Sequence, residues 1–194
     1  MLAHSPSLPL VIDYVEGDDD KDITAEDEEA INLALSQRDR VRRIRLKIPA
    51  LKLQKLTAME GEYPILEYLI LIDPHPEKGT VLILPETLET PHLRHLFINC
   101  SVLIRSPLLG TAAGLVNLYL MLYNPSTYFQ PTVLFQWLSS MPQLEILMIG
   151  FQFAVPNRDV ERQLMRMPIM THATLPNLSR ICIPRCQRLF RSGS

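Results

Sequence analysis

The sequence contains few of the residues that build disulfide frameworks or phosphate-binding loops. It has three cysteines, Cys100, Cys182 and Cys186, so a disulfide framework is not expected and a reducing compartment, cytoplasmic or nuclear, fits better. Its seven glycines form no phosphate-cradling pattern. No stretch approaches the ~18 uninterrupted apolar residues of a membrane span. The N-terminus also lacks the basic and apolar regions of a secretory signal.

Motifs of catalysis and metal binding are also missing. The chain has no G-x-S-x-G, H-E-x-x-H or C-x-x-C pattern. His92 and His95 are three apart on an expected strand, so we expect them to project to opposite faces. A calcium loop starting at Asp18 would need glycine at its sixth position, where Ile23 stands. The sequence therefore predicts no enzyme, no cofactor and no metal site.

The small net charge of −2 hides an uneven distribution of charge. Residues 1–39 hold eleven acidic and two basic residues, whereas the remainder holds ten acidic and seventeen basic residues. Such a split can mark an acidic tail or a basic ligand site. The simpler interpretation, which we favour, places the acidic segment beside the basic one in the folded chain, where the two offset each other.

The chain repeats one pattern, L-x-x-L-x-L, with aliphatic substitutions. Six copies begin at positions 41, 66, 93, 115, 144 and 178, at steps of 25, 27, 22, 29 and 34 residues. All but the last step fall in or near the range of a leucine-rich repeat, roughly 20–29 residues. Each unit would supply one strand and one return segment, and stacking would bury the leucines in a continuous core. Their neighbours would then face outward, since side chains alternate along a strand.

Local signals add further elements. We expect a strand at 10–14, a polar turn at 16–22 and a strand at 40–47, and helices at 24–38, 50–60, 132–141 and 157–167, with a helical turn at 106–110 and a short apolar run at 81–84. The helix at 24–38 has the best-defined start, because Thr24 can cap it and Asp27 stands three residues on. We expect Arg38 to close its last turn and Trp137 to anchor the helix at 132–141 in the core.

The outward positions of the repeats predict a binding surface. They form one band that is cationic at one end and aromatic or aliphatic in the centre, and they comprise Arg43, Arg45, Lys47, Tyr68, Ile70, His95, Phe97, Asn117, Tyr119, Met121, Ile146 and Met148. Exposed apolar bands of this size mark interaction sites, and Tyr, Phe, Met and Arg are enriched in interface cores. The alternative is a cover supplied by the chain's own loops or by a missing segment.

The pattern P-x-L-E-x-L at Pro64 and Pro142, with the runs DITAEDEE (22–29) and RDRV (38–41), resembles the repeat portion of fungal F-box proteins. In such proteins an F-box precedes the repeats and docks on the adaptor of an SCF ubiquitin ligase, while the repeats hold the substrate. The resemblance implies substrate recruitment and not transfer chemistry. Only nine residues precede the first expected strand, so the F-box is expected to be absent here. The chain is then a fragment of a longer protein or a repeat domain that works without a ligase dock.

Together these observations predict an α/β leucine-rich-repeat solenoid, with parallel strands on the concave face and irregular helices and loops on the convex side. We expect a short disordered N-terminus at 1–9, the repeat domain at 10–184 and a basic, loose tail at 185–194. The expected function is a non-catalytic scaffold that binds an unknown protein on its concave face, with an SCF adaptor only if an F-box lies upstream. Nucleic-acid binding through strand 40–47 and the C-terminal arginines is the alternative, although the pI near 6.2 argues against it. No membrane partner is expected.

Overall fold

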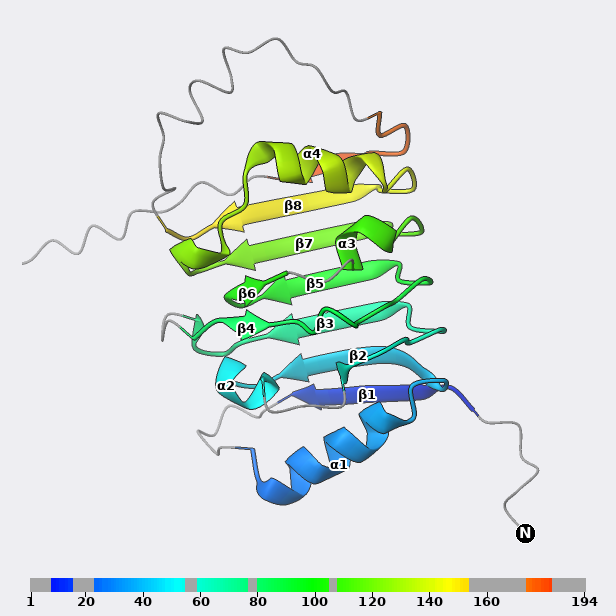
Figure 1. The fold of residues 1–194 in the computed structure, drawn as a ribbon, viewed down its shortest axis with the longest axis vertical. Coiled ribbons are helices and arrows are strands. Elements are labelled where there is room, and N and C mark those ends of the chain that lie inside the picture. Colours follow the sequence, from blue (N-terminus) through cyan, green and yellow to red (C-terminus); the bar gives the residue numbers. More distant parts are fainter. Residues whose placement is uncertain are drawn as a thin grey trace, which may run out of the picture.

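The computed structural model describes residues 8–15, 23–54, 59–76, 80–104, 108–153 and 174–182. Its main element is a seven-stranded, all-parallel sheet whose strands follow one another in chain order. The strands are β1 (Leu10–Val15), β2 (Val41–Lys47), β3 (Tyr68–Ile72), β5 (His95–Asn99), β7 (Asn117–Leu122), β8 (Ile146–Phe151) and β9 (Arg180–Cys182). The predicted strands therefore lie side by side in sequence order, and the chain is an α/β protein (Figure 1).

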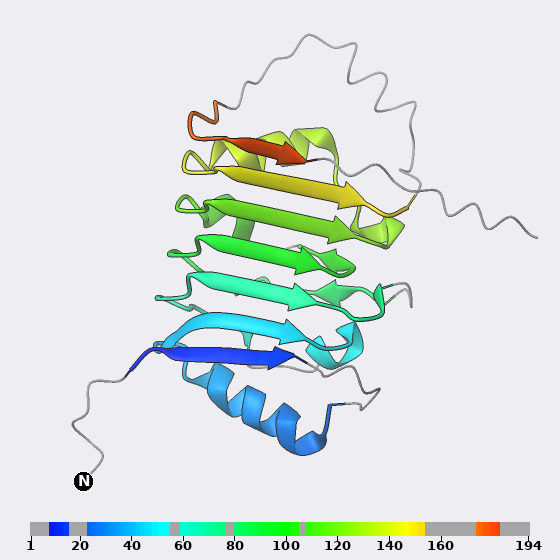
Figure 2. The ribbon, with the colours of Figure 1, turned by 180° about the vertical axis from the view of Figure 1, so that it is seen from behind.

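The segments that return the chain lie on one side of this sheet. They include α2 (Ala50–Leu53), β4 (Leu82–Ile83), β6 (Val102–Leu103), α3 (Leu108–Thr111), the 3-10 turn η3 (Pro125–Thr127) and α4 (Pro131–Ser139). Strands β4 and β6 pair with each other in a second, two-stranded parallel sheet. Viewed from the opposite side, no described helix or loop crosses in front of the strands (Figure 2). We call this side of the large sheet, which no described element covers, the open face.

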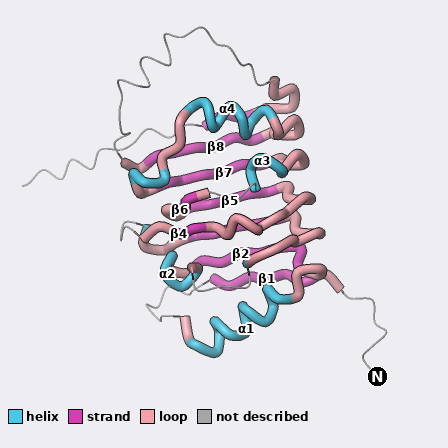
Figure 3. The backbone as a smooth tube through the Cα atoms, viewed as in Figure 1, coloured by secondary structure: helices cyan, strands magenta, loops and turns pink. Residues whose placement is uncertain are grey.

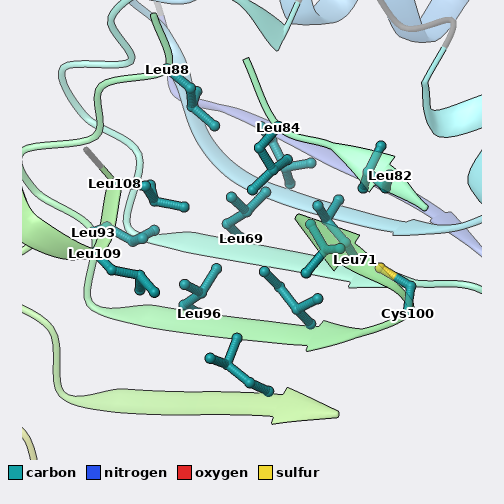
Figure 4. Packing of buried hydrophobic residues seen from close by; sticks show 14 of the residues in the cluster. Leu69, Leu71, Leu82, Leu84, Leu88, Leu93, Leu96, Cys100, Leu108 and Leu109 are labelled. Atoms are coloured by element: carbon teal, nitrogen blue, oxygen red, sulfur yellow. The ribbon is translucent and has the colours of Figure 1, made fainter. Parts of the chain in front are cut away.

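The repeating leucines fill the space between the sheet and the return segments. Across the strands the register aligns Ile44, Leu69, Leu96, Leu118 and Leu147 in one inward row. A second inward row holds Leu46, Leu71, Ile98, Leu120 and Ile149. Figure 4 shows Leu69, Leu71 and Leu96 packed among Leu82, Leu84 and Leu93 of the returns. The L-x-x-L-x-L pattern thus produces the core that it predicts.

Helix α1 (Ala25–Ser36) covers the β1 end of the sheet (Figure 3). The predicted capping box is confirmed, because the Thr24 hydroxyl accepts the Asp27 N–H while the Asp27 carboxylate accepts the Thr24 N–H. Ile31 and Leu35 face the core. Tyr63 precedes β3, and its hydroxyl donates a hydrogen bond to the Leu35 carbonyl at 3.2 Å. This bond ties the covering helix to the second repeat.

Several local predictions need correction. Helix α1 ends at Ser36 with Gln37 as its C-cap, so Arg38 does not close its last turn. Instead the Arg38 guanidinium lies over Gly61. A Cβ on Gly61 would stand 2.5 Å from Nη1 of Arg38, and the φ angle of Gly61 is +85°. Helix α2 covers Ala50–Leu53 of the expected helix at 50–60, and residues 55–58 of that range lie outside the described residues. Trp137, in contrast, packs against the core from α4 as predicted, and it is partly exposed.

Other predictions fall on residues that the structure does not describe. These are the disordered start within 1–7, the polar turn at 16–22, the helix at 157–167 and the basic tail at 185–194. Within the described residues, no helix combines the length and the apolar character needed to cross a bilayer.

Two cysteines provide a chemical check of this arrangement. Cys100 follows β5 and is 0% exposed, and burial raises the pKa of its thiol to about 12, with Asp73 nearby adding to the effect. Cys182 in β9 is partly exposed. Because the thiolate is the reactive species, we expect iodoacetamide to modify Cys182 in the native protein and Cys100 only after unfolding. Peptide mass spectrometry would measure both, with labelling in denaturant as the control. Equal native labelling of the two would contradict the packing around β5.

Candidate interaction surface

Three rows of side chains run across the strands on the open face. The first row holds Val11, Arg43, Tyr68, His95, Asn117, Ile146 and Arg180. The second row holds Asp13, Arg45, Ile70, Phe97, Tyr119, Met148 and Cys182. The third row holds Val15, Lys47, Ile72, Asn99, Met121 and Gly150. The register therefore brings all twelve predicted site residues onto one face.

Eleven of these twelve residues are partly exposed, and Met121 differs from them. It stands in the third row but is only 7% exposed. Its strand neighbour Asn99 accepts a hydrogen bond from the Tyr123 hydroxyl at 2.8 Å. The Tyr123 side chain therefore reaches toward this row from the end of the strand that carries Met121. Little of Met121 is therefore accessible to a partner, and its part in binding stays a prediction.

Strand β2 forms the cationic end of the open face. Arg45 pairs with Asp13 of β1, with 3.7 Å between Nη1 and Oδ2. The Arg43 guanidinium carbon lies 5.6 Å from the centre of the Tyr68 ring, within range of a cation–π contact. Lys47 makes no ion pair with any described residue. Arg43 and Lys47 thus keep positive charge available at this end.

The uneven charge of the sequence is partly balanced within the fold. Asp13 pairs with Arg45, and Glu28 of α1 pairs with Lys52 of α2. Each pair joins the acidic first 39 residues to the basic remainder, as the favoured interpretation predicts. The third ion pair among the described residues joins Arg42 to Glu67, which lies outside the acidic segment. The acidic turn at 16–22 lies outside the described residues.

Two aromatic pairs occupy the centre of the open face. Tyr68 and His95 stack with centroids 4.3 Å apart, and Phe97 and Tyr119 stack at 4.0 Å, with interplanar angles of 12° and 9°. Each pair joins adjacent strands, so the ring normals point along the rows and the rings stand upright on the sheet. Their faces cover one another, and their edges, which carry partial positive charge, point outward.

His95 contacts a polar neighbour in the first row. Its Nδ1 lies 2.8 Å from Asn117 Nδ2, in a hydrogen bond whose donor and acceptor depend on the histidine tautomer. Burial lowers the pKa of His95 and the nearby Arg94 charge lowers it further, against smaller opposing effects of Glu67 and Glu145. The imidazole therefore adds no positive charge to the face at neutral pH.

Burial also raises the pKa of the Tyr119 phenol. The hydroxyl consequently stays protonated at neutral pH and can donate or accept a hydrogen bond. The centre of the open face is then apolar over its rings and polar at His95, Asn99, Asn117 and the phenol groups of Tyr68 and Tyr119.

The chain matches no family model, no curated protein and no solved structure. The resemblance to leucine-rich repeats therefore depends on the residues and the register of this chain alone.

Among the described residues, no three His, Cys, Asp or Glu side chains converge into a group that could hold a metal ion. His92 lies before β5 and not within it, as the strand begins at His95. It lines a shallow hollow at the rim of the sheet with Ile65, Glu67 and Arg94. His92 therefore stands at the rim of the sheet and His95 on the open face. The prediction placed them on opposite faces of one strand.

Residues that the predicted site omits also lie on the open face. They are Val11, Asp13, Val15, Ile72, Asn99, Gly150, Arg180 and Cys182. The alternation of strand 10–14 holds the signal for the first three, because Leu10, Ile12 and Tyr14 alternate with them. Their inclusion extends the open face to both ends of the sheet.

Proposed function

We propose that this chain is a non-catalytic scaffold that binds another protein on its open face. The observation that carries this proposal is the band of partly exposed Ile70, Phe97, Tyr119 and Met148 in the second row, with no described element in front of it. Uncovered apolar bands mark interaction sites, and buried aromatic anchors supply most of the affinity of an interface.

A leucine-rich-repeat solenoid, with these strands on its concave side, is the architecture that we infer. Sheet order equal to chain order and two continuous inward rows of aliphatic residues support it. By the resemblance to F-box proteins, the scaffold would recruit a substrate for a ubiquitin ligase, and an adaptor would dock only through an F-box encoded upstream. The cytoplasm or nucleus is the compartment that this role requires.

The charges of the open face favour an acidic partner. Arg43 and Lys47 lie at one end, and Asp13, a carboxylate at that end, is already paired with Arg45. Upright rings add the positive edges of Tyr68 and Phe97. Such a surface steers an acidic protein and repels a basic one.

Nucleic-acid binding, the alternative from the sequence, gains less support from the same geometry. Bases stack on exposed ring faces in single-strand binding proteins. The faces of Phe97 and Tyr119 cover each other, and Arg42 and Arg45 are paired with carboxylates. The C-terminal arginines lie outside the described residues. If nucleic acid were the ligand, its affinity would fall steeply with salt, by about 0.7–0.9 log units per phosphate contact for each tenfold rise.

Replacing Phe97 and Tyr119 with serine is expected to weaken partner binding by at least about thirtyfold, because the loss of even one hot-spot anchor costs about 2 kcal/mol or more in a well-packed interface. Partners would be recovered with the full chain as bait, identified by mass spectrometry, and then measured as purified proteins by calorimetry. A second variant, R43E/K47E, leaves the rings in place and should weaken the binding of an acidic partner, because it replaces charge attraction with repulsion.

Leu33→Ser with Leu51→Ser is the matched control, since these leucines are 68% and 61% exposed on α1 and α2. Circular dichroism would check that each variant folds. A partner that binds both open-face variants as tightly as the control variant would refute the assignment of this face.

A further inference from the structure

The apolar side chains of the open face form a row that crosses the strands. The second row passes from Arg45 of β2 through Ile70, Phe97 and Tyr119 to Met148 of β8, whereas the flanking rows carry the polar His95, Asn99 and Asn117. Four strand spacings separate β2 from β8, which is about 19 Å at ~4.8 Å each. Three rows span about 13 Å along the strands, at two residues per step. A ligand that matches this pattern must cross the strands.

The backbone of such a ligand decides its conformation. On the open face the N–H and C=O groups of the strands are already paired sideways within the sheet. An extended ligand could form a ladder only at a sheet edge, not across the face. Lying over the apolar second row, it would leave buried backbone groups without partners, which is costly. A helix satisfies its own backbone groups and avoids this cost.

We propose that the ligand is an amphipathic α-helix that lies across the strands, with acidic side chains at the end over β2 and apolar side chains over Phe97 and Tyr119. This inference rests on the proposed protein-binding function. A helix about 10–12 Å wide fits the three rows, and about 13 residues at 1.5 Å each cover the distance from β2 to β8. Apolar residues at i, i+3, i+4 and i+7 would contact the second row.

The probe is a phage-displayed library of random peptides, each 16 residues long, selected on the immobilised full chain. Selected pools are expected to show apolar residues at helical spacing and acidic residues gathered toward one end. A parallel selection on R43E/K47E is expected to reverse that preference to basic residues. Individual peptides would bind F97S/Y119S at least about tenfold more weakly than the unaltered chain, and the L33S/L51S control equally well.

The possible results distinguish a failure of the helix inference from a failure of the proposed protein-binding function. Peptides that depend on Phe97 and Tyr119 but alternate apolar and polar residues would overturn the helix and keep the protein-binding face. Peptides indifferent to F97S/Y119S, or a selection that enriches nothing above background, would overturn both. Helical peptides whose charge preference ignores R43E/K47E would overturn the assigned direction across the sheet.

Discussion

Replacing Leu96 with alanine is expected to lower the free energy of unfolding by about 3–5 kcal/mol, which is the cost of cavities left by fully buried leucines. Leu96 is 1% exposed and stands in the middle of the inward row, between Leu69 and Leu118. Strand β5 also lies at the centre of the sheet, so a cavity at Leu96 weakens packing against the strands on both sides of it. Denaturant unfolding followed by circular dichroism would measure the change.

Leu33→Ala is the matched control for this experiment, because Leu33 is 68% exposed on α1. Exposed substitutions of this kind change stability by about 0.5 kcal/mol or less. If Leu96→Ala and Leu33→Ala had equal effects, Leu96 would not stand in the core and the strand register would be wrong.

Replacing Tyr63 with alanine is expected to cost about 3–5 kcal/mol as well, by analogy with other buried aromatic residues. Tyr63 is 0% exposed, and its hydroxyl donates to the carbonyl of Leu35 in α1. Tyr63→Phe keeps the ring and removes that bond, so it should cost only about 1–3 kcal/mol. The difference in unfolding free energy between the two variants separates the contribution of ring packing from that of the hydrogen bond to α1.

The ionisation of Tyr63 is expected to lower the stability of the fold at alkaline pH. Burial raises the pKa of Tyr63 to about 12, against a lowering effect of Arg38, from an ordinary value of 10.0. A raised pKa in the folded state means that the folded protein binds the proton more tightly. The stabilising contribution is therefore complete below pH 10 and is lost as the pH rises toward 12.

A two-unit difference in pKa corresponds to about 2–3 kcal/mol. Tyr63→Phe has no ionisable group at this position and should lack this component, so the unaltered chain and the variant should converge in stability between pH 10 and 12. Parallel curves over that range would show that Tyr63 ionises as freely as an exposed tyrosine.

The period of the leucines was enough to predict the sheet. Leu69, Leu96, Leu118 and Leu147 each take the middle leucine position of a repeat, and alternation then assigns Phe97 and Tyr119 to the other face. The start of α1 was equally readable, since the Thr24 and Asp27 pair is a local signal. The first prediction depends on a spacing that recurs along the chain, and the second on two residues three positions apart.

Contacts between distant segments were beyond such reasoning. Met121 is buried although it stands in an outward row, and the bond from Tyr123 to Asn99 joins residues 24 positions apart. The stacking of Tyr68 on His95 requires the register of two strands as well as their composition. The early end of α2 and the placement of Arg38 over Gly61 likewise depend on neighbours that no local pattern specifies.

The agreement between strand order and chain order has an evolutionary consequence. Each inner strand bonds only to its predecessor and its successor in the large sheet, so duplication or deletion of one unit needs no rethreading of the chain. Every such event lengthens or shortens the molecule by one increment of about 4.8 Å. An event between Lys47 and Tyr68 would change how far the arginines stand from the rings, and so the length of ligand that bridges them.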